Sequence, residues 1–517
     1  MKKLLRSWLC AACFIPAGLA TAHAADDWQT VSDPGKIIPA AGEYAILISE
    51  AIAKDAGWSK VAATLQKRYK GKILKWKENV TELEAALKDA RPRYIAVVAK
   101  PQEIDRVVVA DLHGMARRIE PDFYGDAIFG IITARSPKQA ELLVEAQKAP
   151  LLIERGVSTT NCDLERFKRH FLVTDWEASQ YVETRNGVSS EKKILPEGKE
   201  IVELFAKKFD EINPQYLISA SHATEFNLEM PYSRGLIAPA KGKFYCFKTA
   251  QFRDFLRRMG NAEEVEKYAK EHKLLSIKPT DDPKIWIASG NCLFGDILRN
   301  PDSVAATLLS EYGVRQLVGY TVPTWYGVGW DVHGNFFNGH QDVTVSQAWY
   351  FTNQRNLERL PEVLRSHKLP LRAKDMSGID MSTLRRALSE SKAEVTHDNL
   401  GRFHDRDVIA FYGDPLFRSA FDQKAKNCQP WHYTLETKGK ARRLTVKGTQ
   451  GKTRKSEFRF WFPELRNTDE AIRFTRVKGN AREAVDVAHS STKNFLMLPD
   501  QMELTPDERL VIEYSVR

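Results

Sequence analysis

The segment IVELFAKKFDEINPQYLISASH, residues 201 to 222, holds a helix signal followed at once by a strand signal. The apolar residues that recur at helical spacing are Ile201, Leu204, Phe205, Phe209 and Ile212. Asn213 and Pro214 then end the helix, because a residue before proline disfavours helical backbone. The run QYLISA is short and apolar, as a buried strand is. The segment predicts a helix that feeds a strand, with His222 just past the end of that strand.

The same unit occurs twice more along the chain. SVAATLLSEYG precedes VRQLVGYTV at residues 303 to 322, and TELEAALKDA is followed shortly by RYIAVVA, which ends at residue 99. Alternation of helices and strands is typical of a largely parallel sheet with helices on both faces, so we expect an α/β fold. In such sheets the functional loops lie at the carboxyl ends of the strands.

A second strand-like run, KIWIASGNC at residues 284 to 292, delivers a cysteine at its end. A thiolate is a nucleophile, and a nearby histidine takes the proton of the thiol. The 70 residues between His222 and Cys292 leave room for the crossover that joins neighbouring parallel strands. The backbone amides of Cys292 and of a residue near Ala223 would supply the two donors that stabilise an oxyanion. Gly290 and Gly295 would let a substrate chain approach closely. The alternative is a buried cysteine and an unrelated loop histidine.

The first 24 residues have the pattern of a secretory signal: Lys2, Lys3 and Arg6, an apolar stretch, then Ala-His-Ala before Ala25. We therefore expect a secreted or periplasmic protein. The signal holds three of the 77 basic residues and none of the 67 acidic ones, which leaves a net charge of +7. This excess is too mild for a dedicated nucleic-acid-binding protein. Cys162, Cys246 and Cys428 receive no role, and so few cysteines form no disulfide scaffold.

After about residue 425 the pattern changes to short strand-like pieces separated by Gly, Pro, Asn and Asp. In EFRFWFPEL, Phe458, Phe460 and Phe462 alternate with Glu457, Arg459 and Trp461, so one face of this strand is apolar. The pattern predicts an all-β immunoglobulin-like sandwich over residues 425–517.

These motifs together resemble the gingipain-type cysteine peptidases, a family with a caspase-like fold. SASHATEF and SGNCLFGD resemble the family's histidine and cysteine motifs, the latter with its Gly-Asp pair. The segment from PDFYGD to LLIER and the element VIAFYGDPLFR resemble further family elements, in the same order. The resemblance implies an N-terminal α/β subdomain at 25–155, a catalytic caspase-like subdomain at 156–424 and an immunoglobulin-like domain at 425–517.

By the same resemblance the protein is an exported cysteine endopeptidase that acts on protein or peptide substrates. His222 would be the base and Cys292 the nucleophile that forms a thioester with the scissile carbonyl. Asp122 and Trp325 match pocket positions of the family, which implies a basic residue before the cut. We expect that no cofactor is required, and the sequence leaves open a structural metal ion such as calcium. The sequence departs from the family pattern at Ala223, where glycine is usual, and at Asn291, where a small residue is usual.

Two alternatives rest on other residues. WDVHGNFFNGHQD and THDNLGRFHDRD are rich in potential ligands for zinc or similar ions, which would suit a metal-dependent hydrolase. These ligands are Asp331, His333, His340, Asp342, His397, Asp398, His404, Asp405 and Asp407. The nine basic residues between Lys438 and Arg459 would instead suit a catalytically inactive binding protein whose C-terminal domain contacts the cell envelope.

Overall fold

The computed structural model describes residues 27–325, 327–340, 342–372, 378–422, 430–449, 453–499 and 502–517. The expected secretory signal and Cys428 lie outside these ranges. No helix within them is long and apolar enough to cross a membrane.

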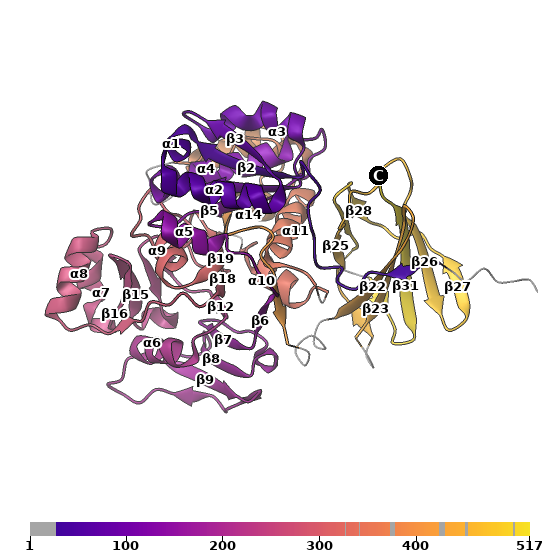
Figure 1. Ribbon diagram of the computed structural model, residues 1–517. Helices are drawn as coiled ribbons and strands as arrows, with labels where there is room; N and C mark the ends of the chain where they lie inside the picture. Colours follow the sequence, from indigo (N-terminus) through magenta and orange to yellow (C-terminus); the bar gives the residue numbers. More distant parts are fainter. Residues whose placement is uncertain are drawn as a thin grey trace, which may run out of the picture.

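A large mixed sheet forms the centre of the molecule (Figure 1). Its strands in spatial order are β10 (Val188–Ser189), β9 (Gln180–Arg185), β8 (Arg169–Val173), β7 (Arg155–Ser158), β12 (Tyr216–Ser219), β18 (Lys284–Ala288), β19 (Val314–Tyr320), β20 (Ile409–Tyr412), β5 (Ile128–Ile132), β4 (Tyr94–Val98), β2 (Tyr44–Ser49) and β3 (Lys72–Trp76), while β11 (Lys193–Ile194) pairs with β9. The β10/β9, β9/β8 and β19/β20 pairs are antiparallel and the other neighbours along this order are parallel. The largely parallel α/β sheet is therefore confirmed.

Helices cover both faces of this sheet because the chain reverses direction across it. From β2 the chain steps outward to β3 and then returns past β2 to β4 and β5. Right-handed crossovers therefore place α2 (Ala56–Tyr69) on one face and α3 (Glu84–Ala90) and α4 (Arg106–Arg117) on the other. The helix α2 packs on α5 (Pro137–Leu143), and α5 packs on α9 (Val304–Glu311).

The helix-to-strand unit predicted from residues 201 to 222 is confirmed. The helix α6 spans Ile201–Ile212, and Asn213 ends it in the left-handed conformation with φ 44°. All four residues of β12 are buried. The other two predicted units correspond to α9 with β19 and to α3 with β4.

Further elements surround the central layers. They are α1 (Glu50–Lys54), α7 (Phe252–Leu256), α8 (Ala262–Glu271), α10 (Trp330–Phe337), α11 (Val345–Glu358), α12 (Glu362–Arg365), α13 (Met381–Glu390) and α14 (His397–Asp405). A small antiparallel sheet contains β13 (Ala223–Thr224), β14 (Asn227–Glu229), β15 (Leu236–Ala240), β16 (Lys243–Phe247) and β17 (Ser276–Ile277). The strands β6 (Leu151–Ile153) and β21 (Ser419–Phe421) form a separate pair.

The C-terminal region is built from antiparallel sheets, as predicted. One sheet holds β1 (Gln29–Thr30), β22 (Trp431–Lys438), β23 (Ala441–Gly448), β31 (Glu508–Ser515), β26 (Arg473–Lys478) and β27 (Ala481–Ala484). Opposite lie β25 (Arg459–Trp461), β29 (Phe495–Met497) and β28 (Ser490–Ser491), with β24 (Arg454–Lys455) and β30 (Glu503–Leu504) as a further pair. Phe458, Phe460 and Phe462 are buried in the core between these sheets.

The second face of β25 is covered by the central α/β region. Trp461, expected on the face opposite the three phenylalanines, is only 2% exposed, and its indole N–H donates to the hydroxyl of Tyr94. Arg93, at the start of β4, is fully buried and donates to the carbonyl of Pro463 (3.0 Å) and to Oδ1 of Asn494 (3.1 Å). The guanidinium also lies over the Trp461 ring, 5.0 Å from its centroid. The sandwich is thus fixed to the central sheet by buried polar contacts.

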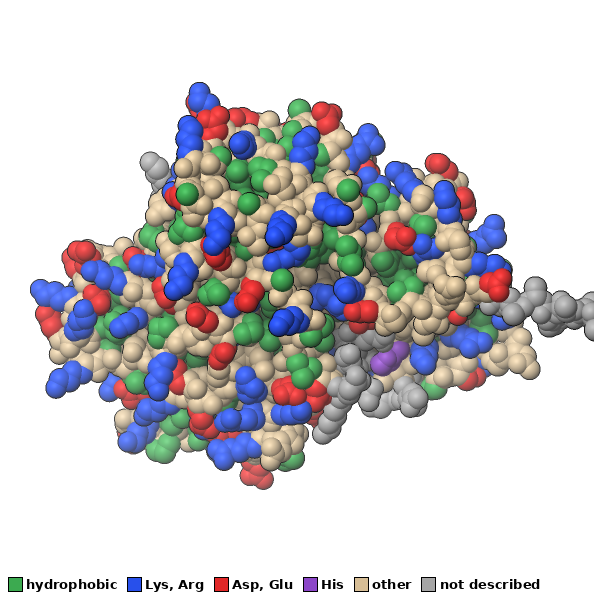
Figure 2. Space-filling view, viewed as in Figure 1, with side chains coloured by type: hydrophobic (Ala, Val, Ile, Leu, Met, Phe, Trp, Pro, Cys, Tyr) green, Lys and Arg blue, Asp and Glu red, His purple; other side chains and the backbone are tan. Residues whose placement is uncertain are grey.

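Charged side chains are mixed in sign on the face shown in Figure 2. Within the basic segment 438–459, Arg442 pairs with Glu464, Arg443 with Glu513 and Arg459 with Glu457. Part of the basic charge of this segment is therefore balanced within the domain. Contact of the domain with the cell envelope stays a prediction.

Candidate active site

The structure places the loops that carry His222 and Cys292 at the ends of neighbouring strands. The strands β12 and β18 pair in parallel, with Ser219 opposite Ala288 at their carboxyl ends. His222 follows three residues after the first strand and Cys292 four residues after the second. Adjacent strands lie about 4.8 Å apart, so the two loops leave the same edge of the sheet side by side.

The loop that contains Cys292 folds back onto the end of β19. Leu293 N–H donates to the carbonyl of Val322 (3.2 Å), and Gly295 N–H donates to the carbonyl of Tyr320 (2.8 Å). Leu293 has φ 59°, a left-handed conformation that L-residues adopt at a cost. The loop is thus held in a defined and locally strained shape.

A glycine at position 295 is required by this close packing. A Cβ there would lie 2.6 Å from the carbonyl carbon of Gly319 in β19. Backbone of the protein itself therefore occupies the space that we expected this glycine to leave for substrate, and that prediction was wrong. At Gly290 a Cβ would meet the Cβ of Ala220 at 3.0 Å and Nε1 of Trp330 at 3.1 Å, so this glycine allows neighbouring side chains to approach.

The Cys292 thiol is half-buried, and its surroundings favour the protonated form. Burial raises the pKa of the thiol, and the carboxylate of Asp405 raises it further, while the backbone N–H of Thr324 acts in the opposite direction. The N–H group is a donor that stabilises negative charge on the sulfur. A base is therefore needed to produce the thiolate at neutral pH.

Asp405 organises the loop that faces the thiol. Its carboxylate accepts from the hydroxyl of Tyr320 (2.9 Å), from the backbone N–H of Gly327 (3.0 Å) and from that of Trp325 (3.3 Å). It also bonds Nδ1 of His404 at 2.9 Å. The Trp325 ring makes an edge contact with the His404 ring, with centroids 5.5 Å apart. Trp325 directly follows Thr324, whose backbone N–H faces the Cys292 thiol. Sequence reasoning assigned Asp405 only to a metal alternative.

His222 has an exposed side chain on a fixed backbone. Its carbonyl accepts from Glu229 N–H (2.9 Å), and the carbonyl of Ser221 accepts from Nδ2 of Asn291 (2.7 Å). Among the described residues the imidazole has no hydrogen-bond partner, so thiol and imidazole are not hydrogen-bonded in this conformation. Ala223 is buried and begins β13, paired with Leu228. Its contribution to an oxyanion hole stays a prediction.

The structure contains another Cys–His pair, which was missed from the sequence. The sulfur of Cys162 is 3.6 Å from Nε2 of His170. Burial raises the pKa of the Cys162 thiol to about 12 and lowers the pKa of His170 to about 3. Both groups therefore stay neutral, which is the opposite of an activated thiolate–imidazolium pair. The close spacing of Cys162 and His170 in the sequence was the signal that could have drawn attention to the pair.

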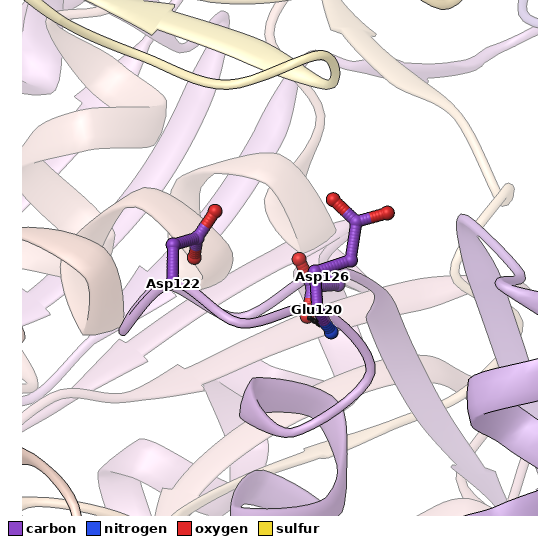
Figure 3. Close-up of side chains that lie close together, drawn as sticks. All are labelled: Glu120, Asp122 and Asp126. Atoms are coloured by element: carbon purple, nitrogen blue, oxygen red, sulfur yellow. Dashed lines mark hydrogen bonds between the residues drawn. The ribbon is translucent and has the colours of Figure 1, made fainter.

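Asp122 lies in a different depression of the surface. It lines a cleft of ≈ 840 Å³ between the ends of α3 and α4 and the helix α12, whose lining includes neither Cys292, His222 nor Trp325. Asp122 shares the loop before β5 with Glu120 and Asp126, and the three carboxyl groups lie within 4.8 Å of one another (Figure 3). Glu120 forms an ion pair with Lys493, which balances one of the three carboxyl groups. Asp126 accepts from the backbone N–H of Glu120 (2.8 Å).

The histidine-rich loops of the metal alternative are separated by their packing. His333 bonds the hydroxyl of Tyr216 (2.8 Å), while the His340 ring packs against Tyr433. Asp407 pairs with Arg117 and Arg406, which hold the pKa of its carboxyl well below the usual value despite burial. Among the described residues, one group of three potential metal ligands lies close together. It consists of Glu120, Asp122 and Asp126, which lie outside both loops. A structural calcium ion stays a prediction.

The fold and site define an α/β protein with a cysteine and a histidine at neighbouring strand ends. No family model and no curated protein sequence matches the chain. Two solved structures are similar at 8% sequence identity. One is the complex of Porphyromonas gingivalis RgpB pro- and mature domains, with a TM-score of 0.37, covering 91% of this chain and 96% of that chain. The other is described as the structure of a protease, with a TM-score of 0.35, covering 93% and 98%. Similarity this distant does not assign the site.

Proposed function

We propose that the protein is a cysteine endopeptidase in which Cys292 is the nucleophile and His222 the base. The observation that carries the proposal is the register of β12 and β18, because it delivers one histidine and one thiol to a common edge of the sheet. The half-buried thiol faces a backbone donor at Thr324, and its loop is held against β19. These features suit a nucleophile that must be placed accurately for attack on a carbonyl carbon.

The proposed reaction begins with a proton transfer from the Cys292 thiol to His222. The thiolate attacks the carbonyl carbon of the scissile peptide, and the oxyanion that forms is stabilised by the backbone N–H of Cys292 and an amide near Ala223. The C–N bond then breaks, and the imidazolium returns its proton to the leaving amine. Water, deprotonated by the same imidazole, hydrolyses the thioester and regenerates the thiol. No cofactor takes part in these steps.

A preference for a basic residue before the cut is the finer part of the proposal and depends on Asp122. The cleft that contains Asp122 does not include Cys292, so a bound substrate would have to extend from the Cys292 thiol to this cleft. Kinetics of Asp122→Ala on peptides with Arg, Lys or Leu before the cut test this part alone. A selective loss for the basic peptides supports it, whereas an unchanged preference removes Asp122 from the assignment.

The dyad is tested by labelling the mature protein with a peptidyl acyloxymethyl ketone and mapping the modified residue by mass. We expect rapid modification of Cys292 in the wild type and in Cys162→Ala, and slow modification in His222→Ala. If Cys292 reacts no faster than an ordinary exposed thiol in the wild type, the peptidase proposal falls. The inactive binding protein would then be the better interpretation, since burial and Asp405 both disfavour the thiolate.

A further inference from the structure

A buried chain of hydrogen bonds connects the loop of Cys292 to the loop of His222. The indole N–H of Trp286 donates to Oγ of Ser219 (2.9 Å), and Oγ of Ser219 donates to Oδ1 of Asn291 (2.5 Å). Nδ2 of Asn291 donates to the carbonyl of Ser221 (2.7 Å). Trp286, Ser219 and Asn291 are at most 2% exposed. The chain therefore runs from β18 to β12, then to the residue before Cys292, and ends at the residue before His222.

The donors and acceptors of this chain allow one arrangement. An indole N–H can only donate, so the Ser219 hydroxyl accepts from Trp286 and must give its own hydrogen to Asn291. This fixes the carbonyl end of the Asn291 amide toward Ser219 and its NH₂ end toward Ser221. The amide orientation, which is ordinarily ambiguous, is thus determined by the network. Alanine at this position would supply neither group.

The end of the chain controls the backbone that carries the imidazole. The carbonyl of Ser221 belongs to the peptide group that contains the nitrogen of His222, and Asn291 holds this carbonyl. On the other side, Glu229 N–H holds the carbonyl of His222, and Oγ of Ser221 donates to the carbonyl of Glu229 (2.7 Å). Both peptide groups that flank the His222 Cα are therefore fixed, one of them by the residue next to the thiol.

We infer that Asn291 is a positioning residue that sets the separation between the His222 imidazole and the Cys292 thiol. This inference rests on the proposed function and adds to it the residue that fixes the position of the base relative to the nucleophile. Because the imidazole has no hydrogen-bond partner among the described residues, its reach toward the sulfur is set by the backbone from which it extends. The link from Asn291 to Ser221 is a direct side-chain connection between the two loops.

The test compares Asn291→Ala, Asn291→Asp, His222→Ala and the wild type. Asn291→Asp keeps the volume and the acceptor for Ser219 but, when ionised, replaces the donor to Ser221 with an acceptor. The rate of Cys292 modification by the ketone probe is measured from pH 5 to 10, alongside modification by iodoacetamide at pH 10. We expect the first rate to fall about 10- to 100-fold in Asn291→Ala, as for a displacement of about 1 Å. The rate at neutral pH should lose its dependence on histidine ionisation, as in His222→Ala.

Modification by iodoacetamide at pH 10 should change less than about twofold, because the thiolate then forms without a base. A general loss of folding in Asn291→Ala would change both rates, and in that case the rates of Asn291→Asp decide the question. If His222→Ala is slow while Asn291→Ala and Asn291→Asp keep the wild-type rate and pH profile, the inference is overturned and the dyad stands. If His222→Ala itself keeps the wild-type rate, the proposed function fails.

Discussion

Substitution of Gly295 by alanine should disturb the candidate site without altering any charged or reactive group. The new Cβ would lie 2.6 Å from the carbonyl carbon of Gly319, whereas carbon atoms in contact prefer at least about 3.5 Å. The loop of Cys292 or the end of β19 must therefore move by roughly 0.9 Å. Overpacking of this kind costs about 1–3 kcal/mol of the free energy of unfolding. A displacement near 1 Å lowers reactivity by up to about 100-fold.

The matched control is Gly334→Ala in α10. A Cβ at position 334 meets nothing within 4 Å, and alanine is favoured over glycine in a helix by about 0.5–1 kcal/mol. Urea unfolding followed by tryptophan fluorescence gives the stability, and mass-resolved modification of Cys292 gives the reactivity. We expect Gly295→Ala to lose both and Gly334→Ala to lose neither. A Gly295→Ala protein with wild-type unfolding midpoint and wild-type modification rate would refute the close packing of this loop against β19.

Three further outcomes follow from other contacts. Because burial raises the pKa of the Cys162 thiol to about 12, mass mapping at pH 8 should find label on Cys292 in the wild type and none on Cys162 in Cys292→Ala; label on Cys162 would contradict this. Removing either partner of the fully buried Arg106–Asp296 pair, whose Nε–Oδ2 distance is 2.8 Å, should cost about 3–5 kcal/mol, and Arg106→Met with Asp296→Leu should recover part of the loss. Simple additivity in this double-mutant cycle would count against the coupling. Burial raises the pKa of Asp126 from 3.8 to about 8, so its contribution to stability is present below pH 3.8 and is lost as the pH rises through 8. Asp126→Asn should therefore reduce the decline of the unfolding midpoint between pH 4 and 8, and parallel declines in both proteins would oppose the assignment.

The strand ends were predictable because each signal is local. Asn213 and Pro214 end α6, and four buried residues follow in β12, so the position of His222 beyond that strand needed no tertiary information. The same holds for Cys292 after β18. Their placement at one edge then followed from the general geometry of parallel sheets.

The contacts that shape the site were not predictable because they join residues far apart in the chain. Asp405 reaches the loop of Trp325 from the end of α14. Its hydrogen-bond partners lie in β19, in the loop that follows β19 and in α14 itself. The sequence marked it only as one of several carboxylates. Trp461 illustrates a second limit, because an alternating strand pattern reveals one apolar face but does not show that another domain covers the opposite face.

The site combines a fixed backbone with a thiol that is not activated at rest. Burial and Asp405 both raise the pKa of Cys292, and the backbone N–H groups of Thr324 and of Cys292 itself lower it. Cysteines that are reactive at rest have nearby cations or helix N-termini that lower the pKa, whereas the described surroundings of Cys292 raise it. The protein instead orders the peptide groups on both sides of His222 and the loop that follows Cys292. Formation of the thiolate must then depend on how closely the imidazole approaches the sulfur in the substrate complex. For this reason the neutral residue Asn291 should affect reactivity at neutral pH more than removal of any charge at the rim of the cleft that contains Asp122.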